Sequence, residues 1–134
     1  MSAEDFENLQ GFNSLEILQL NNVRIPNFSK VHFPALKSLT LKRMKHLESL
    51  DGLEFSPDVD YIYINDAKKL TDLYPLSKLH RLRKLLLEDC SRLQSVINLH
   101  DHPSIKELSF IGKTRTKDNS MDLVSKSKKL QFEP

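Results

Sequence analysis

The sequence predicts an α/β solenoid in which five to six short parallel strands form a concave sheet and short helical or 3-10 turns lie on the convex side. Two patterns of apolar residues lead to this prediction. An apolar motif of the form LxxLxL recurs along the chain, and after each copy an apolar residue returns at every third position. Each unit therefore combines a strand with a turning segment, and about 23 residues complete one coil.

The strand half of each unit is marked by an apolar triplet. Its last two apolar residues alternate with polar ones, so that Leu18 and Leu20 face the core while Gln19 faces solvent. The triplets start 21, 23, 23 and 23 residues apart, a regularity that chance does not produce. They are Leu15-Leu18-Leu20, Leu36-Leu39-Leu41, Val59-Ile62-Ile64, Leu82-Leu85-Leu87 and Ile105-Leu108-Phe110.

The second half of each unit steps by three residues, which suits short helical or 3-10 turns that return the chain over the same core. No single coil can bury its leucines alone, so the coils must stack and their strands must pair in parallel. The three-step series are Met44-Leu47-Leu50-Leu53, Ala67-Leu70-Leu73-Leu76-Leu79 and Cys90-Leu93-Val96-Leu99.

The whole chain, 1–134, is expected to be one domain with five sound repeats over 15–112. Residues 1–14 are expected to form an N-terminal cap or half-repeat, because Ser2 and Asp5 have the spacing of a helix-capping box. Residues 113–134 are expected to hold a mobile polar loop with a short apolar anchor. A degenerate sixth repeat, with Leu130 and Phe132, follows it.

The segment LRKLLLEDCSRLQSV, from Leu82 to Val96, resembles the pattern LxxLxLxxCxxLxxL of the leucine-rich-repeat family, and the other units share its frame over roughly residues 6–132. The repeats look most like those of plant nucleotide-binding immune receptors and of some F-box substrate receptors. The resemblance implies a recognition domain, or a fragment of a larger receptor or adaptor, that binds proteins through its sheet. The family's cysteine position is occupied here by Val23, Met44, Ala67, Cys90 and Lys113.

The composition argues against catalysis and against a membrane protein. The chain has 134 residues, 28% charged and 39% apolar, with three glycines, one cysteine and a net charge of +2. None of the phosphate-binding or hydrolase motifs occurs, so we expect no enzyme activity, no cofactor and no small-molecule substrate. His100-Asp101-His102 is too unspecific to predict a metal site, and Cys90 is expected to be buried and inert.

No apolar run approaches a membrane span, and the N-terminus is acidic and lacks the basic start of a secretory signal. We therefore expect an intracellular protein, cytoplasmic or nuclear, with no membrane contact. A single cysteine cannot form an internal disulfide, which fits a reducing compartment.

The outward strand residues are the predicted recognition surface for a partner protein. Exposed aromatic residues at the centre of a sheet have the character of interface hot spots. The alternative is that the tyrosines only pack across neighbouring strands. The predicted partner-binding residues are Tyr61, Tyr63 and Leu86 at the centre, with Lys84, Glu88, Lys42 and Ile111 around them.

Two other hypotheses remain open. A basic edge formed by Lys45, Lys68, Lys69 and Arg92, with His46, would bind nucleic acid or a ribonucleoprotein. The C-terminal edge would instead allow self-association through a last coil that contains Leu130 and Phe132.

Overall fold

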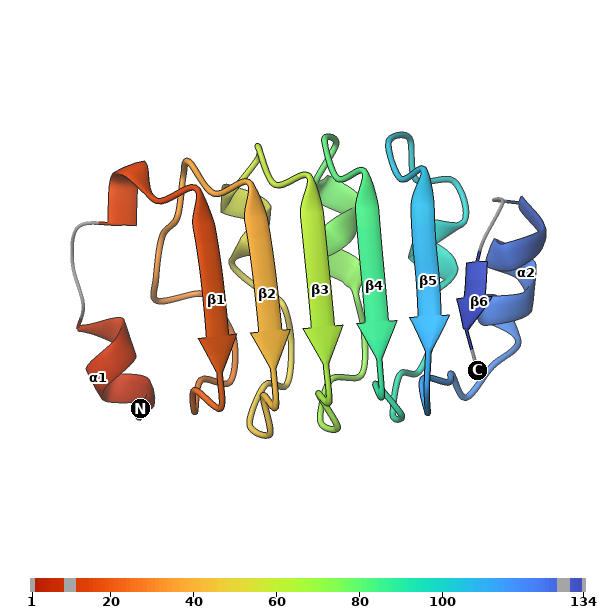
Figure 1. Ribbon diagram of the computed structural model, residues 1–134, viewed down its shortest axis with the longest axis horizontal. Helices are drawn as coiled ribbons and strands as arrows, with labels where there is room; N and C mark the ends of the chain where they lie inside the picture. The colour runs from red at the N-terminus through yellow and green to blue at the C-terminus, as the bar shows by residue number, and fades with distance from the viewer. Residues whose placement is uncertain (1, 9–11, 128–130, 134) are drawn as a thin grey trace.

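The computed structural model describes residues 2–8, 12–127 and 131–133. It contains one parallel sheet in which each strand pairs with the next in the order of the chain (Figure 1). The first five strands start 21, 23, 23 and 23 residues apart, as the apolar triplets predict. The strands are β1 (Ile17–Asn21), β2 (Ser38–Lys42), β3 (Tyr61–Asn65), β4 (Lys84–Glu88), β5 (Glu107–Ile111) and the shorter β6 (Gln131–Glu133).

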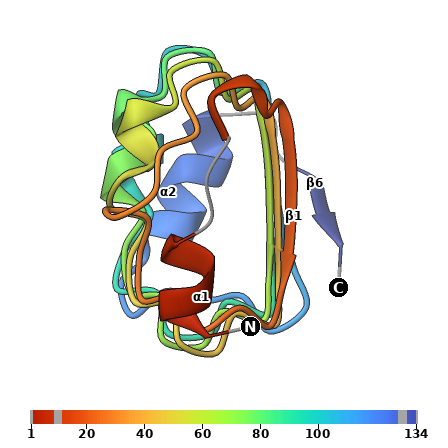
Figure 2. The same ribbon diagram turned by 90° about the vertical axis from the view of Figure 1, so that its left-hand side faces the viewer.

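Short helices and 3-10 turns form a second layer on one side of the sheet, and the other face of the sheet is open (Figure 2). The expected α/β arrangement with an all-parallel sheet is thus confirmed. The helical elements are α1 (Ala3–Glu7), η1 (Phe12–Ser14), η2 (Leu53–Phe55), η3 (Tyr74–Lys78), η4 (Ile97–Leu99) and α2 (Ser120–Ser127).

The core lies between these two layers and contains the apolar residues that the two patterns select. All three-step residues are at most 1% exposed. The inward strand residues Leu39, Ile62 and Leu85 are fully buried, whereas Leu18 on the end strand β1 is only partly buried. Burial therefore depends on having a neighbouring coil on both sides.

Each of the first five strands is followed directly by a residue with left-handed backbone geometry. Left-handed φ is costly for most L-residues, and asparagine, aspartate and glycine tolerate it best. Four of the five positions carry one of these three types, and the fifth is an arginine. The residues are Asn22 (φ 57°), Arg43 (φ 52°), Asp66 (φ 57°), Asp89 (φ 55°) and Gly112 (φ 63°).

The N-terminal cap forms as predicted. The Ser2 hydroxyl accepts a hydrogen bond from the Asp5 amide at 3.1 Å and begins helix α1. Phe6 on this helix is buried, and its ring lies 6.1 Å from that of Phe33, so the helix covers one end of the core.

The segment after β5 differs from the expected mobile loop because it contains helix α2. Asp118 accepts a hydrogen bond from the Ser120 amide at 3.0 Å, and Val124 is fully buried. The backbone of β6 continues the sheet, with Phe132 in register with Phe110 as the repeat spacing predicts. Leu130 lies outside the described residues.

The inward position that follows β5 lies one residue later than the sequence analysis predicts. Lys113 is exposed, and Thr114 is the buried residue. The turn after β5 is one residue longer than the turn after β4, which moves the inward position along the chain. The Thr114 hydroxyl donates to the carbonyl of Leu87 at 2.9 Å and accepts from the amide of Cys90 at 3.2 Å.

Candidate functional site

The register of the sheet brings the predicted recognition residues together on its open face. Tyr61 pairs with Lys84, and Tyr63 pairs with Leu86 on the next strand. Glu88 pairs with Ile111 one strand further along, and Lys42 lies at the end of β2. The seven residues therefore form a continuous surface over strands β2 to β5.

Tyr63 is held in place by two neighbours. Its hydroxyl donates a hydrogen bond to the Glu88 carboxylate, and the Lys42 ammonium lies 6.0 Å from the centre of its ring. Burial and the hydrogen bond to Glu88 raise the pKa of Tyr63 to about 12. The phenol is therefore protonated at neutral pH, and its hydrogen bond to Glu88 on the next strand fixes its orientation.

Tyr61 and Leu86 are less constrained. Both are partly exposed, and within the described part of the chain the Tyr61 hydroxyl has no hydrogen-bond partner. Lys84, beside Tyr61, forms an ion pair of 3.4 Å with Glu107. The centre of the open face thus offers one apolar side chain and one phenol with a free hydroxyl beside the fixed ring of Tyr63.

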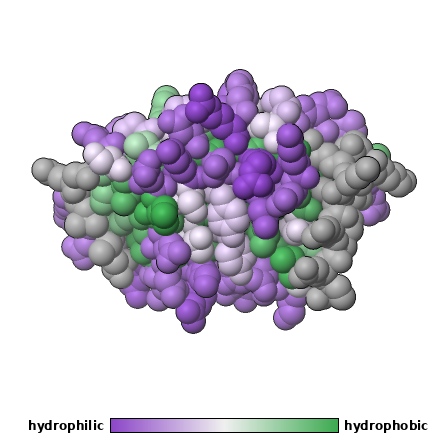
Figure 3. Space-filling view, turned by 45° about the horizontal axis from the view of Figure 1, so that its top comes forward, coloured by the Kyte–Doolittle hydropathy of each residue, from purple (hydrophilic) through white to green (hydrophobic). Residues whose placement is uncertain are grey.

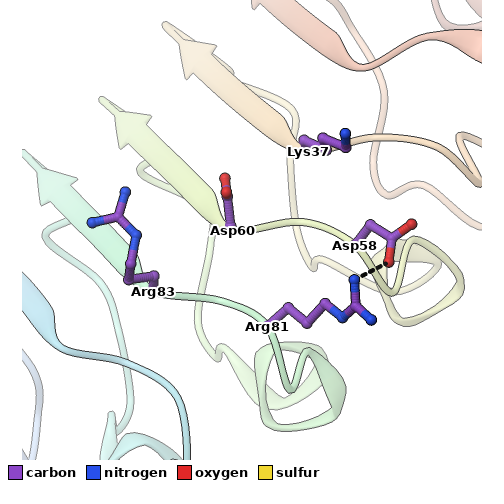
Figure 4. Close-up of a pocket in the computed structure, with 5 residues that line it drawn as sticks. All are labelled: Lys37, Asp58, Asp60, Arg81 and Arg83. Atoms are coloured by element: carbon purple, nitrogen blue, oxygen red, sulfur yellow. Dashed lines mark ion pairs between the residues drawn. The ribbon is translucent and has the colours of Figure 1, made fainter.

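Hydrophilic residues gather along the edge where the strands begin (Figure 3), and the exposed charged residues Lys37, Asp60 and Arg83 lie there. A pocket there is lined by Lys37, Asp58, Asp60, Arg81 and Arg83. Arg81 points toward Asp58 and forms an ion pair of 3.3 Å with it (Figure 4). Positive and negative groups are interleaved in this pocket, so much of the charge is compensated within the chain.

Sequence reasoning missed this pocket, although a signal for it exists. The residue before each of the first five strands is charged, and backbone hydrogen bonds between coils bring these residues side by side. The row occupies the position directly after the first apolar residue of each triplet, where the sequence alone could have revealed it. It consists of Glu16, Lys37, Asp60, Arg83 and Lys106.

The predicted basic edge lies at the opposite end of the strands and is divided. Lys68, Lys69 and Arg92 line one pocket, together with Glu48 and Thr71. A different pocket is lined by Lys45, together with Asn21, Asn22 and Arg43. Lys68 forms an ion pair of 3.7 Å with Asp66.

His102, the second histidine of the motif His100-Asp101-His102, has a structural role. His102 is buried, and its Nδ1 accepts hydrogen bonds from the amides of Ser104 at 3.2 Å and Ile105 at 3.3 Å. With Nδ1 accepting, Nε2 carries the proton and donates to the carbonyl of Leu76 at 2.9 Å. Across residues 2–8, 12–127 and 131–133, no group of three or more His, Cys, Asp or Glu side chains is arranged to hold a metal ion.

Cys90 is fully buried in the core, and burial raises the pKa of its thiol to about 12. The thiolate, which is the nucleophilic form, is therefore scarce at neutral pH.

Comparison with protein-family models, curated proteins and solved structures gave no match. Among the described helices, none is long and apolar enough to cross a membrane.

Proposed function

We propose that the chain is a leucine-rich-repeat solenoid domain that recognises a partner protein through the open face of its sheet. The family assignment is supported by the recurring LxxLxL frame and by the burial of the residues that this frame selects. The binding role is supported by the surface chemistry of the open face, since fold alone does not define function.

One observation carries the proposal: an aromatic side chain at the centre of the open face is fixed before any partner arrives. Glu88 and Lys42 hold the ring of Tyr63, so binding to it costs little side-chain entropy. Tyr61 and Leu86 flank this ring with unused apolar surface and a free hydroxyl. A rigid aromatic anchor with polar groups around it is typical of interface hot spots.

The size of the face adds a condition. Parallel strands about 4.8 Å apart give six strands a face roughly 24 Å long. A strip of this length and about 10 Å wide is smaller than the roughly 800 Å² per partner of a standard interface. The proposed interface therefore includes turns at one edge of the sheet or residues beyond this chain.

The proposal is tested by affinity capture from cell extract with three forms of the chain. The first is unmodified, and the second carries Tyr61→Ala, Tyr63→Ala and Leu86→Ala on the open face. The third is a matched control that removes exposed apolar side chains from the helical side. It carries Phe55→Ala, Tyr74→Ala and Ile97→Ala, at positions that are 65%, 61% and 51% exposed.

We expect proteins that are retained by the unmodified chain and by the helical-side control but lost from the open-face variant. Circular dichroism first establishes that both variants are folded. Titration of a captured partner should then show that Tyr63→Ala weakens binding by about 2 kcal/mol or more. Equal retention by all three forms would reject the open face as the binding surface.

A further inference from the structure

Basic side chains recur at one position of consecutive coils, just after the strands. Lys69 and Arg92 each stand two residues after the buried residue that follows a strand, and they line the same pocket. His46 occupies the equivalent position after Met44. Leu93 and Thr116 form an isolated parallel β-bridge. The residues that precede them, Arg92 and Arg115, therefore lie side by side.

We call this row the basic strip and define it as His46, Lys69, Arg92 and Arg115. All four side chains are exposed. Within the described residues, no ion pair compensates Lys69, Arg92 or Arg115. Three fixed positive charges therefore stand in line on consecutive coils.

The surroundings of the strip are also basic. Among the first five residues after each of β2, β3, β4 and β5, seven are lysine or arginine and two are aspartate. One of these carboxylates, Asp89, accepts a hydrogen bond from the Lys113 amide at 2.8 Å, and the other, Asp66, pairs with Lys68. Glu48 is the acidic residue that lines the strip's pocket. The pocket at the edge where the strands begin differs, because it is lined by both basic and acidic side chains.

We propose that the basic strip binds the sugar-phosphate backbone of a nucleic acid without reading its base sequence. One unpaired cation per coil, at the spacing of parallel strands of about 4.8 Å, forms a periodic row. A phosphodiester chain carries its negative charges at a regular interval, so a periodic row of cations can contact successive phosphates. The strip lies beyond the ends of the strands and contains none of the seven residues assigned to the open face. This proposal therefore does not depend on the protein-binding proposal.

The residues at this edge suit contacts to phosphate rather than stacking on bases. The same sets of five residues after β2 to β5 contain no phenylalanine, tyrosine or tryptophan. The rings of these three residue types, on which single-stranded bases stack in many binding proteins, are therefore missing from these sets. Contacts to phosphate position a nucleic acid without specifying its sequence.

The test is a titration of labelled oligonucleotides of about 20 nucleotides, single-stranded and duplex, followed by fluorescence anisotropy at several salt concentrations. Three phosphate contacts predict a slope of log affinity against log salt of about −2 for single strands and about −3 for duplex. Oligonucleotides of equal length and different sequence should bind within about twofold of one another.

A variant with Lys69→Ala, Arg92→Ala and Arg115→Ala should bind at least about tenfold more weakly, with a correspondingly shallower salt slope. The matched control carries Lys37→Ala, Arg83→Ala and Lys106→Ala at the strand-start edge, which changes the net charge equally and should bind nearly as the unmodified chain does. Equal losses in both variants would overturn the proposal. Tighter binding of a glutamate-rich peptide than of the oligonucleotides would also overturn it and would assign the strip to an acidic protein segment.

Discussion

Tyr63 combines the two properties that decide how the open face behaves, an aromatic ring and an ionisable hydroxyl. Folding raises its pKa from 10.0 to about 12, first through burial and then through the hydrogen bond to Glu88. The protonated phenol thus stabilises the native state. Its contribution is fully present below pH 10 and is lost as the pH rises toward 12.

We therefore expect Tyr63→Phe to flatten the decline of folding stability between pH 10 and 12, because phenylalanine has no proton to lose. Chemical denaturation at a series of alkaline pH values measures this decline. Near-ultraviolet absorbance should also show that the variant lacks the phenol that ionises near pH 12. An unchanged decline in stability would mean that folding does not change the pKa of Tyr63.

The Cys90 thiol leads to a prediction about reactivity. Burial raises its pKa to about 12, and the core covers the sulfur atom completely. A thiol-specific reagent should therefore label the native chain only as fast as the chain opens, and should label it rapidly in denaturant. Labelling of the native chain at the denatured rate would show that the thiol is accessible.

At the scale of elements, Gly52 and Gly112 show how much space the turns leave for a side chain. Gly52 has φ 102°, and a Cβ at this position would overlap the backbone carbonyl of Phe28. Gly112 has φ 63°, and a Cβ there would meet the side chain of Asp89, which can move only by giving up its hydrogen bond from the Lys113 amide. Both turns disfavour an L-residue, but only the first has a fixed backbone obstacle.

Gly52→Ala should therefore reduce the free energy of unfolding by about 3 kcal/mol, which combines left-handed strain with a backbone displacement. Gly112→Ala should cost about 2 kcal/mol, from the left-handed strain and the loss of the hydrogen bond between Asp89 and the Lys113 amide. Guanidinium denaturation of both variants measures the difference. A larger loss at Gly112 than at Gly52 would contradict this reading of the turns.

The elements also mark how far the sequence alone predicts the structure. The strands and their register follow from apolar spacing, because shifting a strand by one residue would expose its leucines. Helix α2 was not foreseen, since its segment offers only Met121, Leu123 and Val124 as apolar anchors and its start depends on the side chain of Asp118. The misplaced Lys113 has a similar cause, because nothing in the apolar pattern shows that one turn is a residue longer.

The candidate sites divide in the same way. Outward strand positions are fixed once the register is known, so the residues of the open face were predictable. The sequence could not show which of these side chains already has a hydrogen-bond partner, because the hydrogen bond between Tyr63 and Glu88 joins residues that lie diagonally on neighbouring strands. The row of charges before the strands follows the same period as the leucines, but exposed charges carry no burial constraint that would draw attention to them.

At the scale of the molecule, the contacts between elements of the described residues join neighbours in the stack. Each strand touches the strands beside it, the turn η3 touches η2 and η4, and η4 also touches α2. Stability in such an array is approximately a sum of coil and neighbour contributions. The same leucine should therefore matter more in the middle of the stack than at its end.

Leu85 and Leu18 allow this to be measured with one kind of substitution. Leu85 lies on β4 between two strands and is fully buried, whereas the equivalent Leu18 lies on the end strand β1 and is only partly buried. Leu85→Ala should cost about 3 kcal/mol or more, because the cavity it leaves has neighbours on both sides. Leu18→Ala should cost about 1 kcal/mol, because its site is already partly open to water and can collapse. Chemical denaturation measures the free energy of unfolding of both variants. Equal losses would contradict a stack stabilised by contacts between neighbouring coils, because the position of a leucine in the stack would then not affect its contribution to stability.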